Sequence, residues 1–175
     1  MNHPTFHTIY EGEGCIDYLQ HISFYITLIS GIIMKRSLFD AVENPEKYAE
    51  YFLTQVHIQM EILKKNPAFS IIIEPIWRGD SGEHQATTGN FIEIFLKNYL
   101  DVLMGSMDIP PDVLSAEKLR LIEGMVIPEC QRIRDGAKKM SVDGVAQIIH
   151  DYYAEEPYYP EVVAALKQVL GDAYR

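Results

Sequence analysis

The residues of this sequence that could do chemistry begin with its histidines, which bind metals and transfer protons near neutral pH. His3 and His7 are four residues apart and would share a metal ion on a helix, but Pro4 between them favours an irregular terminus. His57 lies in a predicted helix near Gln59, where it would either contact a ligand or be an ordinary polar residue of that helix. We therefore predict no metal site and keep His57 as a candidate ligand contact.

Three further side chains, Glu74, Trp77 and Tyr99, are polar or amphipathic and stand next to apolar runs. A pocket for a small molecule needs a few such groups to orient its ligand, although each is also a common packing or surface residue. No nucleophile elbow, phosphate loop, dinucleotide fingerprint or HExxH helix occurs in the sequence. We therefore predict a binding protein without a cofactor, and not an enzyme.

Length and composition fit one globular domain. The 175 residues are 47% hydrophobic and 23% charged, which is ordinary globular usage and weighs against a disordered chain. The formal net charge of -10 opposes binding to a phosphate backbone, which needs clustered lysine and arginine. We therefore expect this chain to bind DNA poorly by itself.

Cysteine usage and hydropathy indicate a cytoplasmic protein. Cys15 and Cys130 are too few and too far apart for a disulfide framework or a cysteine zinc site, so reduced thiols are expected. The most apolar run, residues 22–34, is shorter than the ~20 residues that a membrane span needs. No basic segment precedes it, so neither an anchor nor a signal peptide is expected.

Apolar periodicity predicts two helices in the first half of the chain. Residues 17–37 are apolar over most of a helical circumference, which predicts a largely buried helix. The alternative is a β-hairpin, because β-branched and aromatic residues are frequent there and Ser30-Gly31 could form its turn. The second helix is predicted over residues 45–66, from an Asn-Pro-Glu start to the residue before Pro67.

The middle of the chain contains the most hydrophobic element. Residues 68–77 predict either a brief helix or a buried strand, although Pro75 argues against a central strand. Residues 78–90 have the composition of an exposed loop, and we interpret their Arg-Gly-Asp tripeptide as a chance match. Residues 91–107 predict a helix at the centre of the domain.

The longest amphipathic stripe runs through residues 115–136, where apolar side chains recur at steps of three and four. Gly124 and Pro128 should kink this helix without ending it, and Gly136 should end it. A second stripe follows, with Ser141 as the predicted N-cap, and a last short helix should end before Gly171.

The predicted fold is therefore all-α, a bundle of seven to eight helices with the two amphipathic helices of residues 115–153 as a C-terminal hairpin. Such a hairpin is either an outer layer of one core or half of an intermolecular four-helix bundle. An exposed apolar stripe of this length would make a monomer aggregate, so we predict a homodimer. The predicted interface consists of Leu119, Ile122, Val126, Cys130, Ile133, Val145 and Ile149.

The N-terminal segment with Thr5, Phe6 and Tyr10 resembles the stretch that closes the DNA-binding domain in the tetracycline-repressor (TetR) family of transcriptional regulators. In that family a lysine opens the next helix, where this chain has Glu13. The helices that follow are similar in order to the family's regulatory domain: a long helix, one that closes in an Asn-Pro dipeptide, a central apolar helix, and one with Gly124 where the family often has glycine.

The resemblance implies that residues 1–14 are the end of a DNA-binding domain or a leader. Residues 15–175 would then form a ligand-binding and dimerising regulatory domain that takes a small hydrophobic effector. Contact with DNA would need a helix-turn-helix upstream of Thr5, and only four residues precede it in this chain. The alternative is a helical enzyme or a globin-like sensor, which an absorption spectrum of the purified protein would distinguish.

The effector cavity is predicted between the helices of residues 17–37, 45–66 and 91–107. Aromatic and flexible side chains dominate their inner faces, and such side chains line adaptable apolar pockets. The predicted ligand-binding residues are Tyr25, Phe52, His57, Gln59, Met60, Trp77, Phe95 and Tyr99.

Overall fold

The computed structural model describes residues 9–27, 32–72, 89–137 and 140–174, and the structural statements below concern this part of the chain. It is predominantly helical, as predicted, with one small two-stranded sheet. The strands and longer helices are β1 (Ile9–Glu13), α1 (Cys15–Ile22), α2 (Arg36–Asp40), α3 (Thr54–Lys65), β2 (Ala68–Ile72), α4 (Tyr99–Ser106), α5 (Pro111–Leu121), α6 (Ile127–Arg134), α7 (Val145–Tyr153) and α8 (Tyr159–Leu170). Short turns of 3₁₀-helix are η1 (Ser23–Thr27), η3 (Ala49–Tyr51) and η6 (Gly171–Ala173), and the π-helical turns are η4 (Glu93–Asn98) and η5 (Ile122–Val126).

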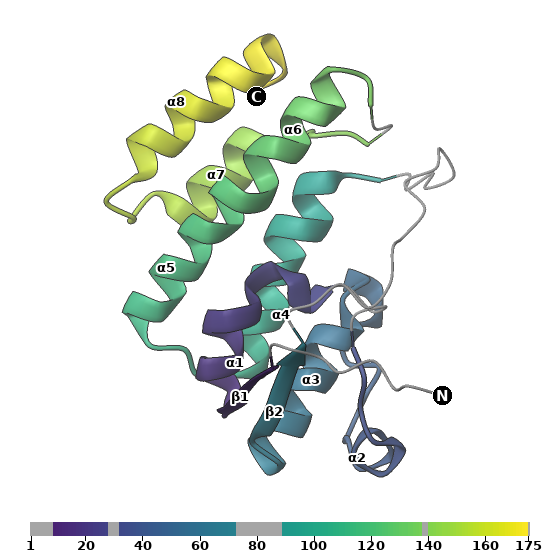
Figure 1. Ribbon diagram of the computed structural model, residues 1–175. Coiled ribbons are helices and arrows are strands. Elements are labelled where there is room, and N and C mark those ends of the chain that lie inside the picture. Colours follow the sequence, from purple (N-terminus) through teal and green to yellow (C-terminus); the bar gives the residue numbers. More distant parts are fainter. Residues whose placement is uncertain (1–8, 28–31, 73–88, 138–139, 175) are drawn as a thin grey trace, which may run out of the picture.

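The helix that starts at residue 91 lies at the centre of the domain, as predicted, and ends as α4 (Figure 1). The side-chain oxygen of Asn90 caps its start by accepting the backbone N–H of Ile92 at 3.0 Å. Tyr99, Leu100 and Leu103 have no exposed surface, and the helix packs against α3. Burying an apolar side chain of this size stabilises the fold by roughly 1.5–3 kcal/mol, so this helix anchors the core.

The elements α5, η5 and α6 form one continuous long helix, which runs beside α8 in Figure 1. Pro128 cannot donate a hydrogen bond to the preceding turn, and the π-helical turn η5 directly before it accommodates this loss. Gly124 in η5 lies close to the Phe24 ring. A Cβ at this position would be only 2.8 Å from that ring. The helix continues through Pro128, as predicted. A widened π-helical turn stands where the sequence predicts a kink.

The end of this long helix is also where the sequence predicts it. Gly136 has φ +76°, and its N–H donates to the carbonyl of Ile133 at 3.0 Å. The N–H of Ala137 donates to the carbonyl of Arg132 at 2.8 Å. This pair of bonds is the Schellman arrangement, which satisfies the last carbonyls of a helix and favours glycine.

The C-terminal helices pack differently from the predicted hairpin. The helix α6 packs mainly along α8, which lies beside it (Figure 1). The helix α7 begins after Gly144, whose φ is +72°, so Ser141 is not its N-cap. Ser141 instead donates its N–H to the carbonyl of Gly89 at 3.0 Å and accepts the N–H of Phe91 at 2.9 Å. These backbone bonds tie the α6–α7 connection to the start of the central helix.

The two helices predicted in the first half are both shorter than expected. The helix of residues 17–37 ends at Ile22, because Ser23 has φ 51° and interrupts the helical hydrogen bonds. The helix of residues 45–66 begins only at Thr54, after turns that end in Phe52 with φ 62°. Non-glycine residues are uncommon in this left-handed region, so their local preferences are overridden by contacts elsewhere in the fold.

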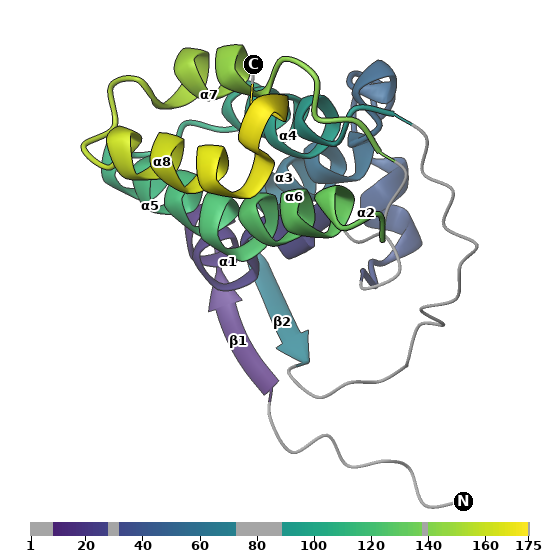
Figure 2. The same ribbon diagram turned by 90° about the horizontal axis from the view of Figure 1, so that it is seen from above.

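The strands β1 and β2 form an antiparallel pair that projects from one side of the helices (Figure 2). Residues 68–72 are thus a strand, although a partly exposed one and not a buried one. β1 has no counterpart among the predicted elements, and it places residues 9–13 within the sheet of this domain. Gly12 permits the arrangement, because a Cβ there would overlap the side chains of Asp17 and Phe69.

The stripe predicted as a dimer interface is mostly covered within the single chain. Leu119 and Ile133 are half-buried. The side chains that are at most 1% exposed are those of Ile122, Val126, Cys130, Val145 and Ile149. The prediction that this stripe faces solvent is therefore wrong, because the other helices of the same chain pack over it.

We accordingly expect Val126→Asp to unfold the domain and not to dissociate a dimer. An uncompensated carboxylate in the core should lower the free energy of unfolding by about 3–5 kcal/mol. Urea denaturation followed by circular dichroism measures this change. The exposed neighbour Gln131→Asp is the control and should stay within about 0.5 kcal/mol of the wild type. A Val126→Asp variant with wild-type stability would contradict the burial of this face.

Candidate functional site

A surface hollow of the described residues lies between the α1–η1 junction and the middle of the long helix. We call it the Arg120 hollow. Its volume is about 470 Å³, which is within the range of small-molecule sites. Its lining residues are His21, Ile22, Ser23, Phe24, Tyr25, Arg120, Glu123 and Gly124.

A buried carboxylate adjoins two of the side chains that line this hollow. Glu117 of α5 has no exposed surface, and its Oε1 accepts hydrogen bonds from Ser23 Oγ at 2.9 Å and from Tyr99 Oη at 2.7 Å. Within the described part of the chain its Oε2 accepts no hydrogen bond, and Arg120 Nη2 is 3.6 Å away. Ser23 and Arg120 therefore connect the buried carboxylate to the hollow.

Burial sets the protonation behaviour of this carboxylate. Desolvation raises the pKa of Glu117, whereas the hydrogen bonds from Tyr99 and Ser23 and the charge of Arg120 oppose the increase. Burial also raises the pKa of Tyr99 well above its ordinary value, so its hydroxyl stays a donor to Glu117. Among the described residues Oε2 accepts no hydrogen bond, and the guanidinium of Arg120 at 3.6 Å is its ion-pair partner.

Ser23 reaches Glu117 through an unusual backbone conformation. Its φ of 51° and ψ of −143° end α1, while its N–H still donates to the carbonyl of Leu19. Such a conformation costs on the order of 1–3 kcal/mol for a residue with a side chain. The hydrogen bond from the buried Ser23 hydroxyl to Glu117 offsets part of this cost.

Arg120, His21 and Glu123 supply polar groups that remain accessible in the hollow. Arg120 Nη1 donates to the carbonyl of Gln20 at 2.6 Å, yet 35% of its side chain stays exposed. The His21 ring stacks on Tyr10 with 3.9 Å between centroids, and its Nδ1 is 3.1 Å from Asp17 Oδ1. The hollow thus combines apolar walls with a guanidinium that is held in place.

The second hollow holds about 390 Å³ and lies where the α7–α8 connection meets α5. Lys118 Nζ is 2.7 Å from Glu156 Oε1, with both side chains 13% exposed, and Ser115 Oγ donates to Glu156 Oε2 at 2.5 Å. These bonds fasten the connection to α5 and use polar groups that a ligand would need. We therefore interpret this hollow as structural.

The cavity predicted between the three helices is occupied by the chain's own side chains. Met60 and Tyr99 are fully buried, and Phe95 packs against Phe91 with 5.3 Å between ring centroids. Tyr25 and Phe52 are 60% and 72% exposed, so the prediction that they line an inner face is wrong. Tyr25 follows the end of α1 and Phe52 precedes the start of α3, so neither ring lies on the helix to which it was predicted to belong.

Gln59 and His57 are buried but make contacts within the protein. Gln59 accepts a hydrogen bond from Tyr18 Oη at 2.6 Å and donates to the carbonyl of Ile26 at 3.0 Å. His57 Nδ1 is 3.0 Å from Ser106 Oγ. Gln59 therefore serves to hold η1 against α3 and not to orient a ligand.

Of the other predicted ligand-binding residues, two lie at or next to the Arg120 hollow and one lies outside the described residues. Tyr25 lines the Arg120 hollow and Tyr99 contacts Glu117, so these two candidates belong to one neighbourhood. Trp77 lies outside the described residues, as do His3 and His7.

The residues of this site that sequence reasoning missed are Ser23, Glu117 and Arg120. One signal for them is present: Val113, Glu117 and Leu121 are spaced by four residues and are all buried on one face of the helix. A carboxylate between two apolar residues at this spacing must be paired or protonated when the face is buried. No comparable local signal marks Ser23.

Comparisons with known proteins do not extend this description. No family model matches the chain, and neither a curated protein nor a solved structure matches it. Across the described ranges, no helix has the length and apolarity to cross a membrane, and no group of three or more His, Cys, Asp or Glu side chains is arranged for a metal ion.

The raised pKa of Glu117 predicts how stability changes with pH. The folded protein keeps this proton at pH values where the unfolded chain has released it, so the stabilising contribution is lost as pH rises through the folded-state pKa. Relative to Glu117→Gln, the wild type should therefore lose stability as pH rises above the ordinary pKa of a glutamate, by at most about 1.4 kcal/mol per pH unit. Chemical denaturation of both proteins at a series of pH values measures the difference. A difference that stays constant, or that grows in the opposite direction, would show that folding does not raise the pKa of Glu117.

Proposed function

We propose that this chain is a small-molecule-binding domain of regulatory type, with the Arg120 hollow as its ligand site. The observation that carries the proposal is the guanidinium of Arg120, which is held by the Gln20 carbonyl at 2.6 Å and by the buried Glu117 carboxylate at 3.6 Å while 35% of its side chain stays exposed in the hollow. A cation fixed in this way beside apolar walls supports a contact with a small molecule at this place.

The walls of the hollow favour a mainly apolar ligand with one polar group. Ile22, Phe24 and Tyr25 offer apolar surface, and Arg120 offers donors for a group that accepts hydrogen bonds. Such a ligand agrees with the small hydrophobic effector that the TetR resemblance implies. Its place differs from the predicted central cavity, which side chains fill.

The contacts of the hollow support sensing as the role of binding. Ser23 belongs to η1, Arg120 to α5, and Glu117 links both to Tyr99 of the central helix. A ligand that binds more tightly to one arrangement of these elements than to another would shift the population of the two. This connection between the surface and the core is what a regulatory domain requires.

Contact with DNA through an upstream helix-turn-helix is an expectation that rests on the family resemblance alone. The expected homodimer rests on that resemblance and on the predicted apolar stripe. A homodimer would need a surface other than the predicted stripe, because most of that stripe is buried in the single chain.

The proposal is tested with a set of eight-carbon probes that differ only in the head group: octanoate, 1-octanol and octylamine. Octanoate or octanol should raise the melting temperature in a saturable way, since both heads accept hydrogen bonds from Arg120. At a hundred times the dissociation constant, binding should add about 2.7 kcal/mol to the stability. Scanning fluorimetry detects the shift, and titration calorimetry gives the dissociation constant.

Matched variants locate the binding site. Arg120→Met should abolish the shift, whereas Glu155→Ala at the second hollow should leave it unchanged. No shift with any probe, or a shift that survives Arg120→Met, would rule out the Arg120 hollow as the site.

A further inference from the structure

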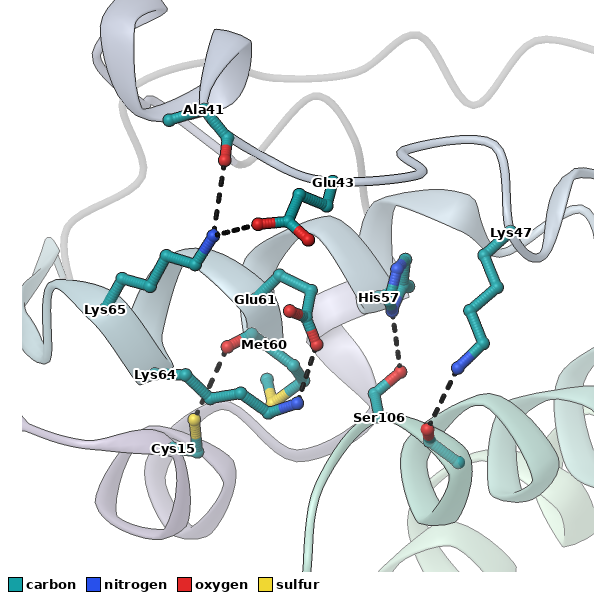
Figure 3. A network of polar contacts seen from close by, with 11 residues as sticks. Cys15, Ala41, Glu43, Lys47, His57, Met60, Glu61, Lys64, Lys65 and Ser106 are labelled. Carbon is teal, nitrogen blue, oxygen red and sulfur yellow. Dashed lines mark hydrogen bonds and ion pairs between the residues drawn. The ribbon is translucent and has the colours of Figure 1, made fainter.

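A segment of irregular structure covers one buried histidine on the other side of the central helix. The segment, residues 41–52, precedes α3, and we call it the strap. His57 of α3 is 3% exposed, and its Nδ1 is bonded to Ser106 at the end of α4 (Figure 3). Its Nε2 has no hydrogen-bond partner among the described residues. Tyr48 of the strap stands edge-on to this imidazole, with 5.2 Å between ring centroids.

The strap is held down by few and long hydrogen bonds. Figure 3 shows Lys65 of α3 reaching Ala41 and Glu43, and Lys47 of the strap reaching α4. These bonds and the one from Asn98 to the carbonyl of Tyr51 are all 3.3 or 3.4 Å long. Long bonds at exposed positions contribute little, so the strap is attached mainly by the packing of Val42, Tyr48 and Tyr51.

Backbone strain makes the strap easier to open. Asn44 near its start and Phe52 at its end both have positive φ, 50° and 62°. An asparagine tolerates this conformation, but an aromatic residue does so only when surrounding contacts enforce it. The Phe52 ring is 72% exposed, so it adds little packing that would retain the conformation.

The groups around His57 disfavour a positive charge on its ring. Burial lowers the pKa of His57, and Lys47 of the strap and Lys64 of α3 lower it further. Glu61 of α3 and the Asn44 carbonyl of the strap act in the opposite direction. Ser106 is neutral and is the only side chain of α4 bonded to the ring among the described residues. The closed strap thus covers a neutral imidazole.

We propose that the strap is a pH-sensitive cover, which lifts from α3 and α4 when His57 takes up a proton. In the closed state a protonated ring would be a buried cation near Lys47 and Lys64, with only Glu61 and the Asn44 carbonyl to offset its charge. In the open state the ring reaches water and regains its ordinary pKa. The closed state is therefore favoured above the ordinary pKa of histidine and loses this advantage as pH falls below it.

The amide protection of the strap measures this equilibrium. Hydrogen exchange of Ala49 and Tyr51, divided by the exchange of an unfolded reference peptide at the same pH, should show about tenfold less protection at pH 5.5 than at pH 7.5. The amides of α8 serve as the internal control for global stability and should keep their protection. Strap protection that is equal at both pH values would overturn the proposal.

Four variants separate the effect of His57 titration from the effect of strap packing. His57→Gln keeps a polar partner for Ser106 but cannot titrate, so its strap protection should not depend on pH, whereas His150→Gln should behave as the wild type. Gly105→Ala should open the strap at both pH values, because a Cβ there would overlap Tyr48 Oη. Adding Tyr48→Phe should restore protection in that variant. A pH dependence that persists in His57→Gln would overturn the proposal.

An independent measurement covers the case in which His57→Gln does not fold. Proton NMR of the wild-type imidazole gives the pKa of His57 directly. A value at or above that of ordinary histidine would overturn the proposal, and a value below it would support the closed, neutral state.

Discussion

The burial of one carboxylate constrains how the helices of this protein meet. Glu117 lies on the core face of α5 between two apolar residues, so its charge and hydrogen-bonding capacity must be satisfied inside the protein. Ser23 and Tyr99 do this by donating to the same oxygen, and they come from η1 and the central helix. The three elements are therefore held in one relative position, and the strained backbone of Ser23 persists because it completes the arrangement.

The same constraint produces the most promising surface of the molecule. Ending α1 at Ser23 brings Phe24 against Gly124 and leaves Arg120 at the edge of a hollow. The second carboxylate oxygen forms an ion pair with Arg120, so the site combines a fixed guanidinium with apolar walls. A small amphipathic molecule meets both conditions, which is why we place the function here and not in the well-packed core.

His57, on the other side of the central helix, is also a buried side chain that can carry a charge, but it is covered by the strap. Within the described part of the chain its buried ring has one bonded and one unbonded nitrogen, and the strap above it is attached by long hydrogen bonds. Glu117 is held by hydrogen bonds from η1 and the central helix, whereas His57 is covered by a strap with two left-handed residues. Protonation of Glu117 should therefore change the overall stability of the domain. Protonation of His57 should change only the local structure of the strap.

Local chemistry in the sequence determined the predominantly helical class, the central position of the helix at residue 91, the irregular turn before Pro128 and the helix end at Gly136. Each of these depends on residues within one or two turns of each other, so periodicity and backbone preferences suffice to predict them. Only the tertiary structure decided the break at Ser23, the late start of α3 at Thr54, the pairing of β1 with β2 and the burial of Val126 and its neighbours. These features depend on partners distant in sequence, as when Glu117 bonds a serine 94 positions earlier. An apolar stripe shows that a face must be covered, but whether the cover is the same chain or a second copy is decided by packing that periodicity does not contain.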